Sequence, residues 1–211
     1  MILRRILLLT VLLLSGLTAM AQEPPADDDF GAWGDIQINK SFSSGIFTAL
    51  RAEYRCCNSW SEMDFWFLRP TVGYKFTDWL SAGLCYDYRQ YNEAVRHCGL
   101  AFVTGTLKSG QLTASLREMF VRSYSFEDAG IMKSNVLRSR LNVQYSEPVT
   151  GMRPYMCIEM FTWRNWQNSR HYVGAIIPLA VNCNLDLSYL FLTKSSGAAQ
   201  HILCAGLNIS L

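Results

Sequence analysis

Alternation of apolar and polar side chains at every second position runs through most of the chain and constrains the fold more than any other feature. Near the middle of the chain, Leu137 and Leu141 fall on one face, whereas Arg138 and Arg140 fall on the other. A period of two residues is typical of a β-strand whose two faces meet different surroundings. Each alternating segment is about 10–12 residues long, which matches a tilted strand that crosses a bilayer.

Eleven segments follow this pattern and are predicted to be strands. They are 30–40, 44–55, 64–76, 80–91, 97–107, 111–123, 136–146, 152–163, 170–180, 184–193 and 201–211. Short turns are expected at one rim and longer loops at the other, with the longest at 124–135, as in bacterial outer-membrane barrels. Such barrels have even strand numbers in single bacterial chains. The odd count therefore means either that one strand is miscounted or that residues 22–30 thread the lumen.

The charged residues on the face opposite the apolar one indicate which face of the barrel wall meets water. A soluble barrel would turn its apolar face inward, but a barrel of about ten or more strands is too wide for side chains to fill. Guanidinium and carboxylate groups suit a hydrated lumen, and only a closed barrel satisfies every backbone group in lipid. We therefore predict a single transmembrane antiparallel β-barrel of about 10–12 strands, with its apolar face toward lipid. The residues predicted to line the lumen are Arg51, Arg55, Arg69, Arg89, Arg117, Arg138, Arg140, Glu53, Asp87, Glu159 and Asp186.

Aromatic residues gather near the ends of the predicted strands. Tyr74, Phe76 and Trp79 fall at one rim, and Tyr91, Tyr124, Trp163 and Trp166 fall at the other. Aromatic girdles at both membrane interfaces are a property of transmembrane barrels. The alternative is that aromatic residues are simply common in strands.

The N-terminal segment has the features of a secretory signal peptide. Arg4 and Arg5 precede an apolar run, and Ala19-Met20-Ala21 forms a small-x-small cleavage site. We predict a cleaved signal peptide over 1–21, a disordered lead-in over 22–29 and the barrel over 30–211. Without the leader, the 19 basic residues fall to 17 and equal the 17 acidic residues, so the charge argues against a nucleic-acid partner.

Cysteine and histidine residues give two weaker interpretations. Cys56, Cys57 and Cys98 fall on neighbouring predicted loops, where they would form a disulfide, bind a soft metal or remain as free thiols. His171 and His201 lie about two strands apart near the same rim, with Ser169 nearby. A serine beside a histidine suggests lipid hydrolysis, but no nucleophile elbow or ordered triad is visible. Neither a metal nor a cofactor is predicted.

Several spaced motifs resemble a known group of proteins. They comprise Trp33, the Arg51–Glu53–Arg55 alternation, segments 69–76, 83–89, 116–118 and 138–145, Pro154-Tyr155 and segment 159–161. Together they are similar to the small outer-membrane barrels of the family named domain of unknown function 2490. The resemblance covers most of residues 30–211. It implies an outer-membrane barrel and no particular activity, because the family itself is uncharacterised.

These observations predict a protein of the bacterial outer membrane with a structural or passive permeation role and an arginine-lined polar lumen. Its expected partners are outer-membrane lipid and the barrel-assembly machinery during insertion. It is not predicted to be an enzyme. Two alternatives remain open: an outer-leaflet barrel enzyme that modifies lipid, and a soluble periplasmic barrel that binds lipid.

Overall fold

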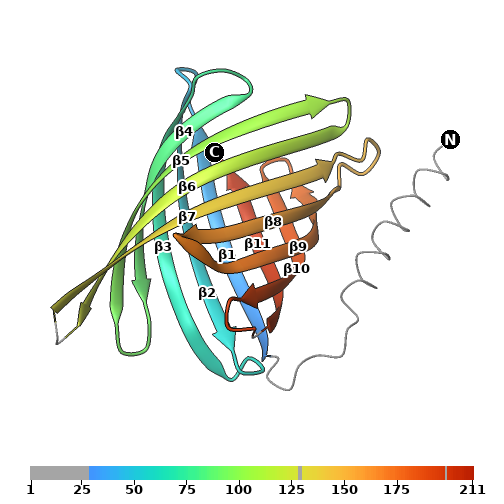
Figure 1. The fold of residues 1–211 in the computed structure, drawn as a ribbon. Helices are drawn as coiled ribbons and strands as arrows, with labels where there is room; N and C mark the ends of the chain where they lie inside the picture. The colour runs from blue at the N-terminus through green and yellow to red at the C-terminus, as the bar shows by residue number, and fades with distance from the viewer. Residues whose placement is uncertain (1–28, 128–129, 198) are drawn as a thin grey trace.

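The computed structural model describes residues 29–127, 130–197 and 199–211, and these residues form one closed β-barrel of eleven strands (Figure 1). The strands are β1 (Asp29–Ser41), β2 (Ile46–Cys57), β3 (Glu62–Lys75), β4 (Leu80–Gln90), β5 (Val95–Ser109), β6 (Leu112–Glu127), β7 (Gly130–Tyr145), β8 (Arg153–Trp163), β9 (Asn165–Ala180), β10 (Cys183–Lys194) and β11 (Ala199–Ser210). This confirms the predicted all-β barrel. The predicted signal peptide and most of the lead-in lie outside the described residues, and Asp29 belongs to β1 rather than to the lead-in.

The barrel closes through a parallel contact between its first and last strands. Every other neighbouring pair is antiparallel, whereas β1 pairs with β11 in parallel from Asp29–Gln200 to Asn39–Ser210. An odd number of strands in an up-and-down order brings the first and last strands together in the same direction. The eleven-strand count is therefore correct, and the alternative of one miscounted strand is wrong. The lumen-threading alternative concerns residues that are mostly outside the described part of the chain.

The predicted difference in loop length between the two rims is wrong. Residues 124–135, predicted as the longest loop, mostly continue β6 and β7, which pair as far as Glu127 and Gly130. Figure 1 shows this hairpin projecting past its neighbours. The longest connection, 146–152, lies at the opposite rim. Alternation continues through Tyr124 and Phe126, so cross-strand pairing persists where the polar residues suggested a loop.

The outward face of the barrel wall is predominantly apolar. Leu84 on β4, Val103 on β5, Leu141 on β7 and Leu203 on β11 are all exposed there. Because side chains alternate between the two faces, each strand places its apolar set outside and its other set inside. The aromatic residues Tyr74, Phe76, Trp79, Trp163 and Trp166 are also exposed near the strand ends.

The inward face is less polar than the sequence analysis predicted. Cys98, Leu100 and Phe102 on β5 pack with Met119 and Val121 on β6 to form a buried cluster. A second cluster contains Leu190, Leu192 and Ile202. Side chains from β5 and β6 and from β10 and β11 thus fill part of the interior, and the charged groups lie in the space between them.

A pair of facing glycines allows the first cluster to pack against the wall. Gly73 on β3 lies directly opposite Gly83 on β4, and the rings of Phe47 and Phe102 lie over them with centroids 6.5 Å apart. A Cβ atom at Gly83 would lie 2.6 Å from the carbonyl oxygen of Val72 and 2.7 Å from the Phe102 ring. Real Cβ atoms essentially never approach other atoms this closely.

We expect Gly83→Ala to destabilise the barrel by about 1–3 kcal/mol, because the added methyl group overpacks this contact. Gly99→Ala on the adjacent strand is the matched control, since a Cβ there meets open space. The control should be neutral or slightly stabilising, because glycine disfavours a strand. Urea unfolding of the protein in lipid vesicles measures both. Equal stability of the two variants would contradict the proposed packing.

Candidate functional site

Three cavities follow one another along the inside of the barrel. The first, about 630 Å³, lies toward the rim where β1 begins and includes Asp29 and Ser195 in its lining. The central cavity, about 320 Å³, shares Arg55, Arg69, Arg138 and other residues with the first. A third, about 220 Å³, shares residues such as Arg117, Arg140 and Tyr155 with the central cavity and extends toward the opposite rim. Because neighbouring cavities have lining residues in common, the three cavities are successive parts of one polar interior.

Arginine dominates the central cavity. Eight arginines and three carboxylates are among its lining residues, namely Arg51, Arg55, Arg69, Arg117, Arg138, Arg140, Arg153 and Arg170 with Asp35, Glu53 and Asp186. The strand period explains the arrangement, because alternate residues of β2 project to the same side. The described interior therefore carries a local surplus of positive charge.

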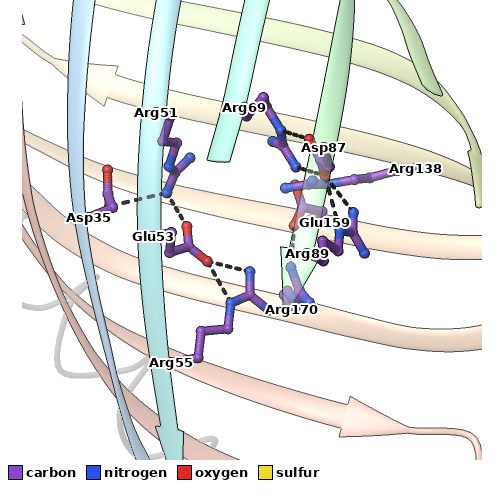
Figure 2. Close-up of polar contacts among 10 residues, drawn as sticks. All are labelled: Asp35, Arg51, Glu53, Arg55, Arg69, Asp87, Arg89, Arg138, Glu159 and Arg170. Atoms are coloured by element: carbon purple, nitrogen blue, oxygen red, sulfur yellow. Dashed lines mark hydrogen bonds and ion pairs between the residues drawn. The ribbon is translucent and has the colours of Figure 1, made fainter. Parts of the chain in front are cut away.

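One ion-pair cluster joins β1 and β2. The guanidinium of Arg51 lies 3.1 Å from Asp35 Oδ1 and 2.6 Å from Glu53 Oε2 (Figure 2). Arg55 lies 2.5 Å from the other oxygen of Glu53. The Arg55 guanidinium also stacks on the ring of Trp33, 3.6 Å from its centroid. These contacts hold both guanidinium groups in fixed orientations.

Asp87 on β4 lies between two arginines. Arg69 donates two hydrogen bonds to it, from Nε to Oδ1 at 2.5 Å and from Nη2 to Oδ2 at 2.7 Å. Arg89 donates to Oδ2 at 2.7 Å. Asp87 is fully buried, so both guanidinium groups compensate a carboxylate that has lost its water.

Glu159 on β8 has the same arrangement. Its Oε1 lies 2.7 Å from Arg138 and its Oε2 lies 3.4 Å from Arg170, and the side chain is fully buried (Figure 2). Arg170 also lies over the ring of Phe161, 4.4 Å from the centroid. Each buried carboxylate is therefore shared by two arginines, and each pair of arginines retains a net positive charge.

Three arginines of the central cavity form no ion pair within the described part of the chain. Arg117 donates from Nε to Thr104 at 2.9 Å, Arg140 donates from Nε to the Cys157 sulfur at 3.1 Å, and Arg153 donates to Asn184 at 3.3 Å. Arg117 and Arg140 also line the third cavity. Such guanidinium groups can bind carboxylate or phosphate oxygens of a solute.

The structure gives the position of every residue predicted to line the lumen. Arg51, Arg55, Arg69, Arg117, Arg138, Arg140, Glu53 and Asp186 line the central cavity, Arg89 lines the first cavity, and Asp87 and Glu159 lie buried between arginines. Their role in permeation stays a prediction. Sequence reasoning missed Asp35, Arg153 and Arg170. The predicted start of a strand at 170 placed Arg170 at a loop boundary, whereas β9 begins at Asn165.

The serine and histidine residues of the enzyme alternative lie on the outward face of strands rather than on loops. Ser169 Oγ lies 3.1 Å from His171 Nε2 and 2.7 Å from Thr193 Oγ1. Phe191 separates the rings of His171 and His201. No carboxylate of the described residues hydrogen bonds to His171, so the pair lacks the third group that orients a catalytic histidine.

The cysteine interpretation also changes. Cys98 is not on a loop but buried on β5, where its sulfur lies 3.2 Å from Ser123 Oγ. Cys56 and Cys57 are the last residues of β2. The seven cysteines of the described chain form no disulfide with one another.

Comparison with known proteins gives a structural relative and a family. A solved structure described as "NanC porin structure in rhombohedral crystal form" superposes with a TM-score of 0.54 at 10% sequence identity, covering 82% of this chain and 90% of that chain. This likeness supports the barrel fold. No curated protein matches the sequence. The model of the family described as "Protein of unknown function (DUF2490)" matches residues 30–201, and the chain belongs to this family.

Proposed function

We propose that this protein is a channel-type barrel of the bacterial outer membrane that lets small hydrophilic solutes diffuse through its lumen and favours anions. The observation that carries the proposal is the excess of arginines over carboxylates in the central cavity. A cation-rich constriction between low-dielectric walls raises the local concentration of anions and lowers that of cations. Outer-membrane lipid would surround it, and the barrel-assembly machinery would insert it.

The outward-facing apolar side chains support a membrane setting over the soluble alternative. A soluble lipid-binding barrel would need these side chains inside, whereas Leu84, Val103 and Leu203 are exposed on the outside. A soluble protein rarely exposes so continuous an apolar surface. The porin title of the structural relative agrees with a channel and with a role that is not enzymatic.

The experiment that tests the proposal is single-channel recording of the purified protein in planar bilayers. Discrete conductance steps are expected, because the three successive cavities share walls along the barrel. Silent protein that still shows heat-modifiable migration on gels would contradict a channel and favour a plugged structural barrel. Extraction from cells by buffer without detergent would contradict the membrane setting itself.

A further inference from the structure

Glu118 on β6 is a carboxylate on the lipid-facing side of the barrel. Its neighbours Arg117 and Met119 face inward, Arg117 in the third cavity and Met119 in the first buried cluster, so Glu118 points outward. Leu116 and Phe120 point outward on either side of it, and all three side chains are exposed. Between the two rims, the described strands carry no other carboxylate on the outward face. A charged group facing hydrocarbon is unfavourable, and where one occurs it usually marks a function.

The hydrogen-bonded register places Glu118 near the middle of the membrane. A row of directly paired residues runs obliquely across the barrel from one rim to the other, because the strands are tilted. Its members are Ile46, Tyr74, Ala82, Val103, Glu118, Ser139, Met160, Ser169 and Thr193. Ile46 begins β2 at one rim, Thr193 lies beside the turn at the other, and Glu118 is the central member.

Among the described residues, only one of the two oxygens of this carboxyl group has a hydrogen-bond donor. Ser139 Oγ donates a hydrogen bond to Glu118 Oε2 at 2.6 Å. Glu118 Oε1 has no hydrogen-bond donor among the described residues. Lipid chains offer no hydrogen-bonding group at this depth. Another protein surface with a polar group at the same depth would complete the site.

Glu118 lies at the edge of an outward groove that suits close packing. The groove has a volume of about 700 Å³ and spans β2 to β7, with the small side chains of Ala82 and Ala101 among its lining residues. Phe120 on β6 lines the groove, Leu116 stands beside it on the same strand, and both are exposed. In membranes, small residues allow two protein surfaces to approach closely, and van der Waals packing and hydrogen bonds drive association.

We propose that this groove is a two-fold interface between two copies of the chain in the membrane, with the two Glu118 carboxyl groups hydrogen bonded across the axis. An isologous interface must be self-complementary. Two carboxyl groups that share a proton meet this condition, because one donates and the other accepts. An axis at Glu118 also brings Leu116, Phe120 and the groove of each copy into the contact, because all of them adjoin Glu118. The inference rests on the membrane setting proposed above.

The test is single-molecule photobleaching of the fluorescently labelled full chain in lipid vesicles over a range of protein densities. The wild type should bleach mainly in two steps at densities where chance co-occupancy is negligible. Ala82→Trp fills the groove and should leave mainly single-step bleaching. Glu118→Lys should do the same, because two cations would face each other in hydrocarbon. Glu118→Gln keeps a donor and an acceptor, so its dimer should weaken by no more than about tenfold.

Ala205→Trp is the matched control. Ala205 lines a second outward groove that spans β3, β2, β1, β11 and β10, so filling it should leave two-step bleaching unchanged. Heat-modifiable migration verifies that each variant is folded. A folded, inserted wild type that bleaches in one step at every density would overturn the interface and leave the proposed channel standing. Two-step bleaching that survives Ala82→Trp, or that is lost equally with Ala205→Trp, would show that copies meet elsewhere and would also overturn it.

Discussion

Replacing Glu159 by alanine should destabilise the barrel by about 3–5 kcal/mol, the largest effect expected of a single lumen substitution. The glutamate is fully buried and lies between Arg138 and Arg170. Its removal leaves two guanidinium groups in the interior without a counter-charge. The cost is the desolvation of unpaired ions, which exceeds the energy of the lost contacts. Urea unfolding in lipid vesicles measures the change.

Asp186→Asn provides the comparison in the same lumen. Asp186 accepts a hydrogen bond from the Tyr155 hydroxyl at 2.8 Å and forms no ion pair among the described residues. An amide oxygen can accept the same hydrogen bond, so stability should change by less than about 1 kcal/mol. If Glu159→Ala were no more destabilising than Asp186→Asn, the buried cluster of Glu159 with Arg138 and Arg170 would not be stabilising the barrel.

Reversing the charge at Arg117 and Arg140 together should change the ion preference of the proposed channel from anions to cations. Both arginines line the third cavity and neither forms an ion pair in the described chain, so the substitutions break none. With Asp186 nearby, the doubly substituted cavity would hold three carboxylates. We expect the anion-to-cation permeability ratio to fall by at least about tenfold, which is roughly 1.4 kcal/mol of relative barrier height. The reversal potential in a salt gradient measures this ratio.

The control for that experiment changes the net charge of the chain by the same amount on the outer surface. Arg122 on β6 and Lys133 on β7 are exposed and lie on the outward side of the wall. Replacing both by glutamate should leave the permeability ratio close to that of the wild type, because salt and distance screen their field from the lumen. A similar change in both double variants would show that selectivity does not arise inside the barrel.

The fold could be predicted because the two-residue alternation in the sequence is the same as the alternation of side chains between the two faces of a barrel wall. Residues 136–146 alternate so regularly that only a strand separates Leu137 and Leu141 from Arg138 and Arg140. The same period predicts all eleven strands. The parallel closure of β1 on β11 could not be predicted in this way, because alternation determines which face a residue occupies and not which strand pairs with which.

The interior was harder to predict than the wall. Leu100 and Phe102 carry no signal that separates an inward apolar residue from an outward one, and they fill part of a lumen predicted to be polar. Polar residues between Tyr124 and Asn135 suggested a loop, but backbone pairing continued through most of them. The partners of each arginine depend on cross-strand register, which a single sequence does not specify. The charged residue types were therefore predictable, whereas their clusters were not.

The assignment of one face of the wall to lipid and the other to the lumen can be tested with two tryptophans that lie at nearly the same depth. Trp66 is exposed on the outward face of β3, and its row of paired residues runs through Tyr54 to Gly34, the residue next to Trp33. Trp33 instead faces inward, beneath Arg55. Two variants that retain one of these tryptophans each, with the other five replaced by phenylalanine, would be inserted into vesicles of brominated lipid.

Bromine on the acyl chains quenches indole fluorescence on contact. We expect strong quenching of Trp66 and little quenching of Trp33. Strong quenching of Trp33 with little quenching of Trp66 would place the guanidinium-bearing face against lipid and overturn the assignment of the two faces.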